Sequence, residues 1–177
     1  MKTYNIRERI KEYFFINPTA KLRVRQIERE LKLPLPSVIR YCKELEKDGI
    51  LKKILVSGIA MYSADRSSKK YLFGKKNFNF KIIFESGLIE FLIIELHNPA
   101  IVVFGSYARG EDIESSDVDL YIETSSNKRW NFDKYEKILN RKIQIFANKN
   151  INEIKNKELA NNILNGIVLN GYIEVFK

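Results

Sequence analysis

The sequence predicts an α+β fold in two parts. Apolar residues recur at helical spacing through the first fifty residues, and two short β-like runs follow them. After a hydrophilic stretch over 67–77, the apolar run Ile101–Phe104 leads into Gly105-Ser106, the pattern of a buried strand that ends in a tight turn. With 177 residues and 45% hydrophobic content, the chain can form one medium domain or two small ones.

Three helices followed by a hairpin are predicted for the first part. Apolar residues at helical spacing precede Asn17-Pro18, Pro34 and Asp48-Gly49, each of which is a signal for the end of a helix. Pro36 suits the first turn of the third helix, where the N–H that proline lacks has no helical partner. The two strands are predicted over 50–56 and 60–63, joined at Ser57-Gly58.

The second part is predicted to begin with a helix over 78–97, which leads through Asn98-Pro99 into the strand at 101–104. Its remaining predicted elements are a short helix within 128–139, a strand over 142–146, an amphipathic helix after residue 151 and a final strand at 167–169. Trp130, Phe132 and Tyr135 lie in the segment of the short helix, where they either pack on the fold or stack on a base.

Two aspartates follow the Gly105-Ser106 turn. On a strand, alternate side chains share a face, so Asp117 and Asp119 are expected to project together while Val118 points into the core. Two adjacent carboxylates repel each other unless a cation lies between them, and hard oxygen ligands suit Mg²⁺. Gly105 allows the backbone to approach an anion, and the N–H groups of the following turn can hold a phosphate. The sequence therefore predicts a site for a nucleoside triphosphate and a metal ion.

This stretch resembles the nucleotidyltransferase superfamily related to DNA polymerase beta, and in particular its minimal nucleotidyltransferase branch. The residues that carry the resemblance are Gly105, Ser106, Arg109, Gly110, Ser116, Asp117, Asp119 and Leu120. The resemblance implies a short mixed sheet flanked by helices. It also implies Mg²⁺- or Mn²⁺-assisted attack on the α-phosphate of a nucleotide, with release of pyrophosphate. Asp117 and Asp119 would be the catalytic metal ligands, while Gly105, Ser106 and Arg109 would bind the phosphates.

One position departs from the family pattern. Active relatives place a third carboxylate on a neighbouring strand, and the matching position in 142–146 is Gln144. An amide can offer a neutral oxygen to a metal, but it cannot act as a general base. Glu123 shares a face with the aspartates on an ideal strand, yet it lies two pleats beyond Asp119, at ~3.3 Å per residue. Nucleotide binding is therefore expected, while turnover stays open.

The first part resembles the winged helix-turn-helix family of DNA-binding domains. The segment 24–31 resembles its second helix, and 37–51 resembles the recognition helix leading into the wing. The resemblance implies contacts from the recognition helix to base edges and from the wing to phosphates. The implied DNA-binding residues are Ser37, Arg40, Tyr41, Lys43, Lys52 and Lys53. The alternative is a module for dimerisation or protein binding, because acidic residues on the same helix make it less basic.

Composition limits the partners, bonds and locations that the chain can have. The net charge of +9, from 31 basic and 22 acidic residues, favours an anionic partner such as nucleic acid. Because the chain has one cysteine, Cys42, and one histidine, an internal disulfide and a usual zinc site are excluded. Basic residues interrupt any secretory signal near the start, and the longest apolar stretch is too short to span a bilayer. We expect a cytoplasmic protein with no membrane partner.

The predicted architecture is a winged helix-turn-helix at 1–66, a linker at 67–77 and a nucleotidyltransferase-like domain at 78–177. The first functional hypothesis is an enzyme that transfers a nucleoside monophosphate from a triphosphate to a hydroxyl on a protein or nucleic acid. The alternative is a DNA-binding regulator or antitoxin whose nucleotidyltransferase domain is degenerate but still binds nucleotide. A structural adaptor is a third alternative. The expected partners are a nucleoside triphosphate, double-stranded DNA, a toxin-like protein and a second copy of the chain.

Overall fold

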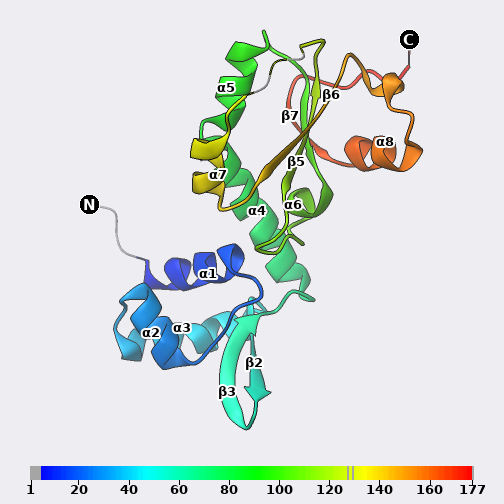
Figure 1. Cartoon of the computed structure of the whole chain (residues 1–177). Helices are drawn as coiled ribbons and strands as arrows, with labels where there is room; N and C mark the ends of the chain where they lie inside the picture. Colours follow the sequence, from blue (N-terminus) through cyan, green and yellow to red (C-terminus); the bar gives the residue numbers. More distant parts are fainter. Residues whose placement is uncertain (1–4, 127, 129, 177) are drawn as a thin grey trace. The chain divides into compact units, whose positions relative to one another are not determined.

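The computed structural model describes residues 5–126, 128 and 130–176. It has the α+β composition that the sequence predicts, and it divides into two compact units, Met1–Phe78 and Asn79–Lys177 (Figure 1). No helix among the described residues is both long enough and apolar enough to cross a bilayer.

The first unit contains the predicted three helices and hairpin. The helices are α1 (Ile6–Ile16), α2 (Val24–Leu31) and α3 (Leu35–Lys47), and the hairpin strands are β2 (Leu51–Val56) and β3 (Ile59–Ala64). An additional strand, β1 (Lys21–Leu22), pairs with β3 and gives the antiparallel order β1-β3-β2. Two residues are too few to show an alternating pattern, so periodicity did not predict β1.

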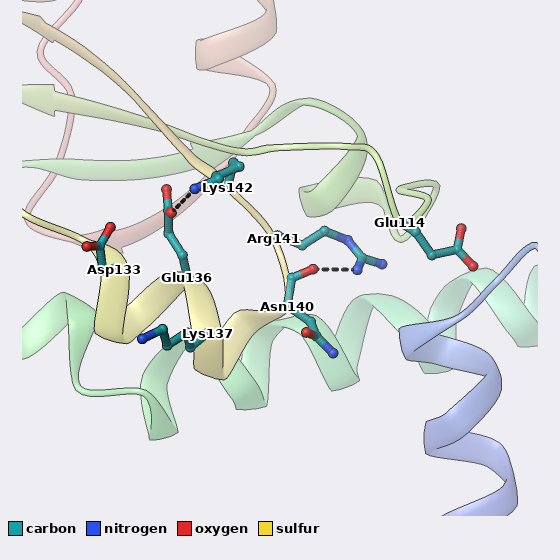
Figure 2. Close-up of a pocket in the computed structure, with 7 residues that line it drawn as sticks. All are labelled: Glu114, Asp133, Glu136, Lys137, Asn140, Arg141 and Lys142. Carbon is teal, nitrogen blue, oxygen red and sulfur yellow. Dashed lines mark hydrogen bonds and ion pairs between the residues drawn. The ribbon is translucent and has the colours of Figure 1, made fainter. Parts of the chain in front are cut away.

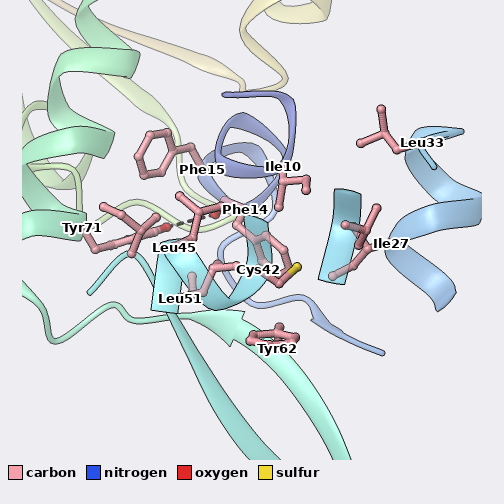
Figure 3. Packing of buried hydrophobic residues seen from close by; sticks show 13 residues of the cluster. Ile10, Phe14, Phe15, Ile27, Leu33, Cys42, Leu45, Leu51, Tyr62 and Tyr71 are labelled. Carbon is pink, nitrogen blue, oxygen red and sulfur yellow. Dashed lines mark hydrogen bonds between the residues drawn. The ribbon is translucent and has the colours of Figure 1, made fainter. Parts of the chain in front are cut away.

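The core of the first unit lies between its three helices (Figure 3). Each helix buries an apolar face, with Ile10 and Phe14 from α1, Ile27 from α2 and Cys42 and Leu45 from α3. Burial raises the pKa of the Cys42 thiol to about 12, so the side chain stays protonated and packs as a small apolar group.

Residues 67–77 are not a solvated connection, because helix α4 (Lys69–Glu85) starts within them. Tyr71 is buried and its hydroxyl donates to the carbonyl of Phe14 (3.0 Å). Lys75 is also buried, and its ammonium donates to the carbonyl of Phe15 (2.7 Å). The abundant lysines indicated a hydrophilic segment. Tyr71 and the aliphatic part of Lys75 are nevertheless amphipathic enough to pack in the core.

The predicted single helix over 78–97 is two helices. Helix α4 ends at Glu85, and α5 (Leu88–Glu95) begins after Gly87, whose φ of +77° breaks the helix. The Ser86 hydroxyl stabilises the break by donating to the carbonyl of Ile83 (2.7 Å) and accepting from the Leu88 N–H (3.2 Å). A small polar residue followed by glycine favours this turn. The turn therefore forms although the continuous apolar pattern predicted a single helix.

The second unit contains the mixed sheet that the sequence predicts. Its strands are β4 (Ile101–Phe104), β5 (Val118–Glu123), β6 (Ile143–Asn148) and β7 (Ile167–Asn170), in the order β6-β5-β4-β7. Strands β5 and β6 are parallel, whereas β4 is antiparallel to both of its neighbours. Figure 1 shows α5 and α7 (Asp133–Leu139) on one side of the sheet and α8 (Lys157–Leu164) on the other.

Candidate functional site

The sequence motif forms the connection between β4 and β5. The short helix α6 (Gly105–Arg109) starts directly where β4 ends, and Gly110 terminates it with a φ of +72°. Phe104, the last residue of β4, pairs with Asp119 on β5. This register brings the start of α6 next to the second aspartate of the motif.

Gly105 and Asp119 are in close contact. Gly105 has a φ of +71°, and a Cβ built on it would lie 2.4 Å from Asp119 Oδ2. Any side chain at this position would be strained and would also displace the carboxylate. The glycine that the motif requires therefore opens a cradle in which the Asp119 carboxylate lies against the backbone.

The two aspartates differ in their surroundings. Asp119 is half-buried on β5, whereas Asp117 is exposed and lies immediately before the strand rather than on it. Val118 between them is fully buried, as predicted. Burial raises the pKa of Asp119, the negative charge of Asp117 raises it further, and Arg109 opposes the shift. The carboxylates are thus close enough to repel each other.

Gln144 lies beside this pair. In the parallel ladder between β5 and β6, Asp119 is paired with Gln144, so the two side chains share a face and Gln144 is exposed to solvent. Glu123 is engaged elsewhere: its Oε1 accepts from the Ile151 N–H (3.0 Å) and from the Tyr121 hydroxyl (3.3 Å). Glu123 therefore has a structural role and does not supply a third acidic ligand.

The donor set suits a divalent cation held by two carboxylates. Within the described ranges, no group of three or more Asp, Glu, His or Cys side chains could hold a metal ion. Asp117 and Asp119 offer hard oxygens of the kind that Mg²⁺ and Mn²⁺ prefer, and the Gln144 amide adds a neutral oxygen in the neighbouring register position. A bound cation would relieve the repulsion that raises the pKa of Asp119.

Arg109 and Ser106, the remaining motif side chains expected to bind phosphate, lie on α6. Arg109 is exposed, forms an ion pair with Glu111 (Nε–Oε2 2.7 Å) and acts electrostatically on Asp119. Ser106 is half-buried in the first turn of α6. Ser116 has a structural role, because its hydroxyl accepts from the Ile113 N–H (3.0 Å) and closes the turn before Asp117.

Comparison with known proteins identifies this region. Residues 88–170 match the family model described as "Nucleotidyltransferase domain". These residues form a nucleotidyltransferase domain. A relative from Methanocaldococcus jannaschii, described as "Putative protein adenylyltransferase", is 41% identical over 59 residues, which are 29% of this chain. The chain spans 59% of the length of that relative. No solved structure matches the chain.

A hollow of about 330 Å³ adjoins the start of β5 in the nucleotidyltransferase domain (Figure 2). Lys142 borders it and connects it to the site, because the Lys142 carbonyl accepts from the Val118 N–H (2.8 Å). The Lys142 ammonium pairs with Glu136 on α7 (2.6 Å). The residues that line the hollow are Glu114, Asp133, Glu136, Lys137, Asn140, Arg141 and Lys142.

Sequence reasoning missed a buried polar network that includes a residue of the motif loop. Asp112 and Arg141 form an ion pair (Oδ2–Nη2 3.1 Å) with only 1% and 4% of their side chains exposed. Asn79 donates to the other oxygen of Asp112 (2.7 Å) and to the carbonyl of Tyr107 (2.9 Å). Asp112 lies within the motif loop, but no local signal indicates Arg141 as its partner.

The aromatic segment of the nucleotidyltransferase domain is largely packed. Tyr135 is buried between Phe91 and Phe132, with ring centroids 5.6 Å and 6.5 Å from its own. The ring centroids of Trp130 and Phe132 are 6.3 Å apart. Trp130 and Phe132 also border a hollow of about 450 Å³ with Ile143 and Ile145 of β6. These isoleucines belong to the sheet face opposite Asp119, so this aromatic group does not line the aspartate site.

In the first unit, α3 and β2 carry the predicted DNA-binding residues. The Arg40 guanidinium lies over the Tyr41 ring (4.3 Å), bonds its hydroxyl and lies 3.7 Å from Glu44. Lys52 lies 3.8 Å from Asp65. Lys43 and Lys53 are exposed, whereas Ser37 and Tyr41 are half-buried. A hollow at the turn between α2 and α3 is lined in part by basic residues that were not predicted to bind DNA, namely Arg25, Arg29 and Lys32.

Proposed function

We propose that the chain is a metal-dependent nucleotidyltransferase that transfers a nucleoside monophosphate from a triphosphate to a hydroxyl group. The observation that carries the proposal is the Gly105–Asp119 contact, which places the Asp119 carboxylate against the start of α6 inside a nucleotidyltransferase domain. The relative described as a protein adenylyltransferase favours ATP as the donor and a protein hydroxyl as the acceptor.

Each residue of the site has a role in this reaction. Asp117 and Asp119 would hold Mg²⁺ or Mn²⁺, which when bound neutralises phosphate charge and makes the α-phosphorus more electrophilic. Ser106 and Arg109 would bind the triphosphate, with Gly105 permitting its close approach. Because Gln144 cannot accept the proton of the attacking hydroxyl, that proton passes to solvent or to the substrate, and we expect slow turnover.

A decisive test is the transfer of label from α-labelled ATP, CTP, GTP or UTP, with Mg²⁺ or Mn²⁺, to an acceptor in cell extract. We expect labelling by the native protein and none by Asp117→Ala/Asp119→Ala. Glu123→Gln is a matched control, because Glu123 is on the same strand but engaged with Ile151, and we expect it to retain labelling. Absence of aspartate-dependent label from every nucleotide would overturn the enzyme proposal.

We further propose that the first unit is a winged helix-turn-helix that binds double-stranded DNA. Its element order, three helices with a hairpin and a short third strand, supports this assignment. Charge supports it as well, because residues 1–78 contain 19 Lys and Arg against 8 Asp and Glu, whereas residues 79–177 contain 12 against 14. The positive charge is thus concentrated in the unit proposed to meet the phosphate backbone.

If the nucleotidyltransferase domain binds nucleotide without turnover, the protein is a DNA-binding regulator or antitoxin, and Gln144 is the observation that favours this second function. A salt-dependent gel shift on DNA from the protein's own promoter tests the DNA-binding arm. Lys43→Ala and Lys53→Ala should weaken the shift, whereas Lys81→Ala, an exposed lysine of the second unit, should not. An unaltered shift in the first two variants would contradict the assignment of α3 and β2.

Two protein partners belong to the same proposal. A toxin-like protein would be the acceptor for nucleotide transfer or the target of an antitoxin, and a second copy of the chain would form a homodimer, as is usual for DNA-binding modules that read paired half-sites. Co-purification of an acceptor together with the molar mass of the isolated protein in solution tests both. A monomer that captures no acceptor would contradict them.

A further inference from the structure

A buried network joins four parts of the nucleotidyltransferase unit around one carboxylate. Asp112 accepts from Arg141 through Oδ2, with Nε at 3.1 Å and Nη2 at 3.1 Å, and from Asn79 through Oδ1 at 2.7 Å. The Tyr107 hydroxyl completes the network by donating to the Asn79 carbonyl (3.2 Å). Asn79 comes from α4, Tyr107 from α6, Asp112 from the loop after α6, and Arg141 from the connection between α7 and β6.

The network involves both segments that lead to the candidate site: the loop before Asp117 and the segment that leads into β6. Asp112 is in the loop that ends at Asp117, and Arg141 is three residues before Gln144 on β6. Between these points, the Val118 N–H donates to the Lys142 carbonyl (2.8 Å), the first link between the loop and β6. The Asp112–Arg141 pair and this backbone bond therefore hold the same two segments together.

Most of the loop that carries Asp117 is exposed to solvent. Glu111, Glu114, Ser115 and Asp117 are exposed, and Ile113 is only half-buried. Asp112 is the only residue between Gly110 and Val118 that the structure places in the buried class. The buried contact of this loop is thus a carboxylate that Arg141 and Asn79 hold from two sides.

We propose that Asp112 and Arg141 are positioning residues that hold Asp117 where it can share a divalent cation with Asp119. The proposal rests on the proposed nucleotidyltransferase function. A purely stabilising role is a weaker explanation of the pair, since well-packed apolar residues commonly stabilise a core as well as a buried ion pair does. Residues that orient metal ligands typically change metal affinity about 10–100-fold when they are replaced.

Asp112→Asn tests the proposal, because it keeps the size of the side chain while removing the charge that Arg141 holds. Arg141→Lys is the conservative partner variant, since it keeps a positive charge but loses the two-nitrogen contact. Leu92→Ala is the matched control: Leu92 is fully buried in the core of the same unit, on α5, and is not part of the Asp112 network. All proteins are compared as full chains well below their melting temperatures.

Two measurements are made on each protein, hydrogen exchange of the amides of residues 110–118 and Mn²⁺ binding by calorimetry. We expect Asp112→Asn to accelerate exchange in this loop and to weaken Mn²⁺ binding about tenfold. Arg141→Lys should have an intermediate effect on both. Leu92→Ala should lower the melting temperature while leaving loop exchange and Mn²⁺ affinity near the native values.

The outcomes separate this proposal from the function on which it rests. Loop exchange and Mn²⁺ affinity in Asp112→Asn that match those of Leu92→Ala would overturn the positioning role. If the native protein shows no Mn²⁺ binding that depends on Asp117, the proposed function fails. In that case faster loop exchange in Asp112→Asn still supports the anchoring of Asp117, and unchanged exchange overturns it.

Discussion

At the scale of single residues, the contact between Gly105 and Asp119 defines the site. The glycine combines a left-handed backbone with a carboxylate so close that no Cβ fits between them. Gly58 offers a comparison, because its φ is +78° but nothing lies within 4 Å of a Cβ built there. The two glycines therefore separate the effect of backbone strain from the effect on the carboxylate.

We predict that Gly105→Ala and Gly58→Ala each lose about 1–2 kcal/mol of unfolding free energy through left-handed strain. Only Gly105→Ala should also lose Mn²⁺ and nucleotide binding, because its methyl group displaces the Asp119 carboxylate. Denaturant unfolding and calorimetric titration measure the two quantities. Native Mn²⁺ affinity in Gly105→Ala would show that the cradle is not part of the metal site.

Asp119 gives a prediction for pH dependence. Its pKa is raised in the folded state by burial and by Asp117, so the folded protein binds this proton more tightly than the unfolded chain does. Stability is therefore lost as the pH rises from the unfolded-state pKa of about 3.9 through the raised folded-state pKa. Asp119→Asn, which cannot ionise, should melt at a higher temperature than the native protein above this window and at a similar temperature below it.

Thermal melts of both proteins across pH 3 to 8, roughly spanning the aspartate range, check this expectation. Mg²⁺ is the internal control, since it should stabilise the native protein and leave Asp119→Asn nearly unchanged. A variant that melts at or below the native temperature at neutral pH without Mg²⁺ would contradict the assigned repulsion between the two carboxylates.

Gln144 gives a third residue-scale prediction. Because it is paired with Asp119 across β5 and β6, Gln144→Asp would add a third carboxylate at the same face. We expect tighter Mn²⁺ binding and nucleotide transfer at least about tenfold faster, since a positioned general base is typically worth about 10²–10⁴-fold. Gln144→Asn is the neutral control of matching length, and equal rates for the two variants would show that a carboxylate here does not take part.

At the scale of elements, apolar patterns predicted α1, α2, α3, the hairpin and strands β4, β6 and β7 of the second sheet, and the aspartate motif predicted β5. The two failures have different causes, a distant partner in one and a local turn in the other. Helix α4 forms where lysines indicated a linker because Tyr71 and Lys75 reach carbonyls of α1. Gly87 and Ser86 break a continuous apolar pattern because a turn at this point satisfies the backbone locally.

Helix α4 provides a matched pair of substitutions. Tyr71 is 1% exposed, whereas Phe73 on the same helix is 68% exposed. We predict that Tyr71→Ala costs about 3–5 kcal/mol of unfolding free energy, because it leaves a cavity and removes a buried hydrogen bond. Phe73→Ala should change stability by less than about 0.5 kcal/mol. Equal losses in denaturant unfolding would show that the first half of α4 is not packed on the first unit.

At the scale of the whole molecule, the division between the units falls at Phe78 rather than within a solvated linker. We predict that a fragment of residues 1–66 is much less stable than one of residues 1–78, because only the longer fragment retains Tyr71 and Lys75. Circular dichroism melts of the two fragments check this expectation. Equal melting temperatures of the two fragments would instead place the end of the first unit at residue 66.

The nucleotidyltransferase motif of the second unit is recognisable in the sequence, since Gly105, Ser106, Asp117 and Asp119 lie within one strand–turn–strand segment whose spacing is local. Which residues surround that motif depends on the packing of distant segments. Gln144 faces Asp119 through a parallel ladder, and Arg141 reaches Asp112 across 29 positions of the chain. Periodicity reports which side of an element is buried, but it carries no information on which distant side chain completes a buried charge. Packing of α7 and β6 against the motif loop supplies that partner.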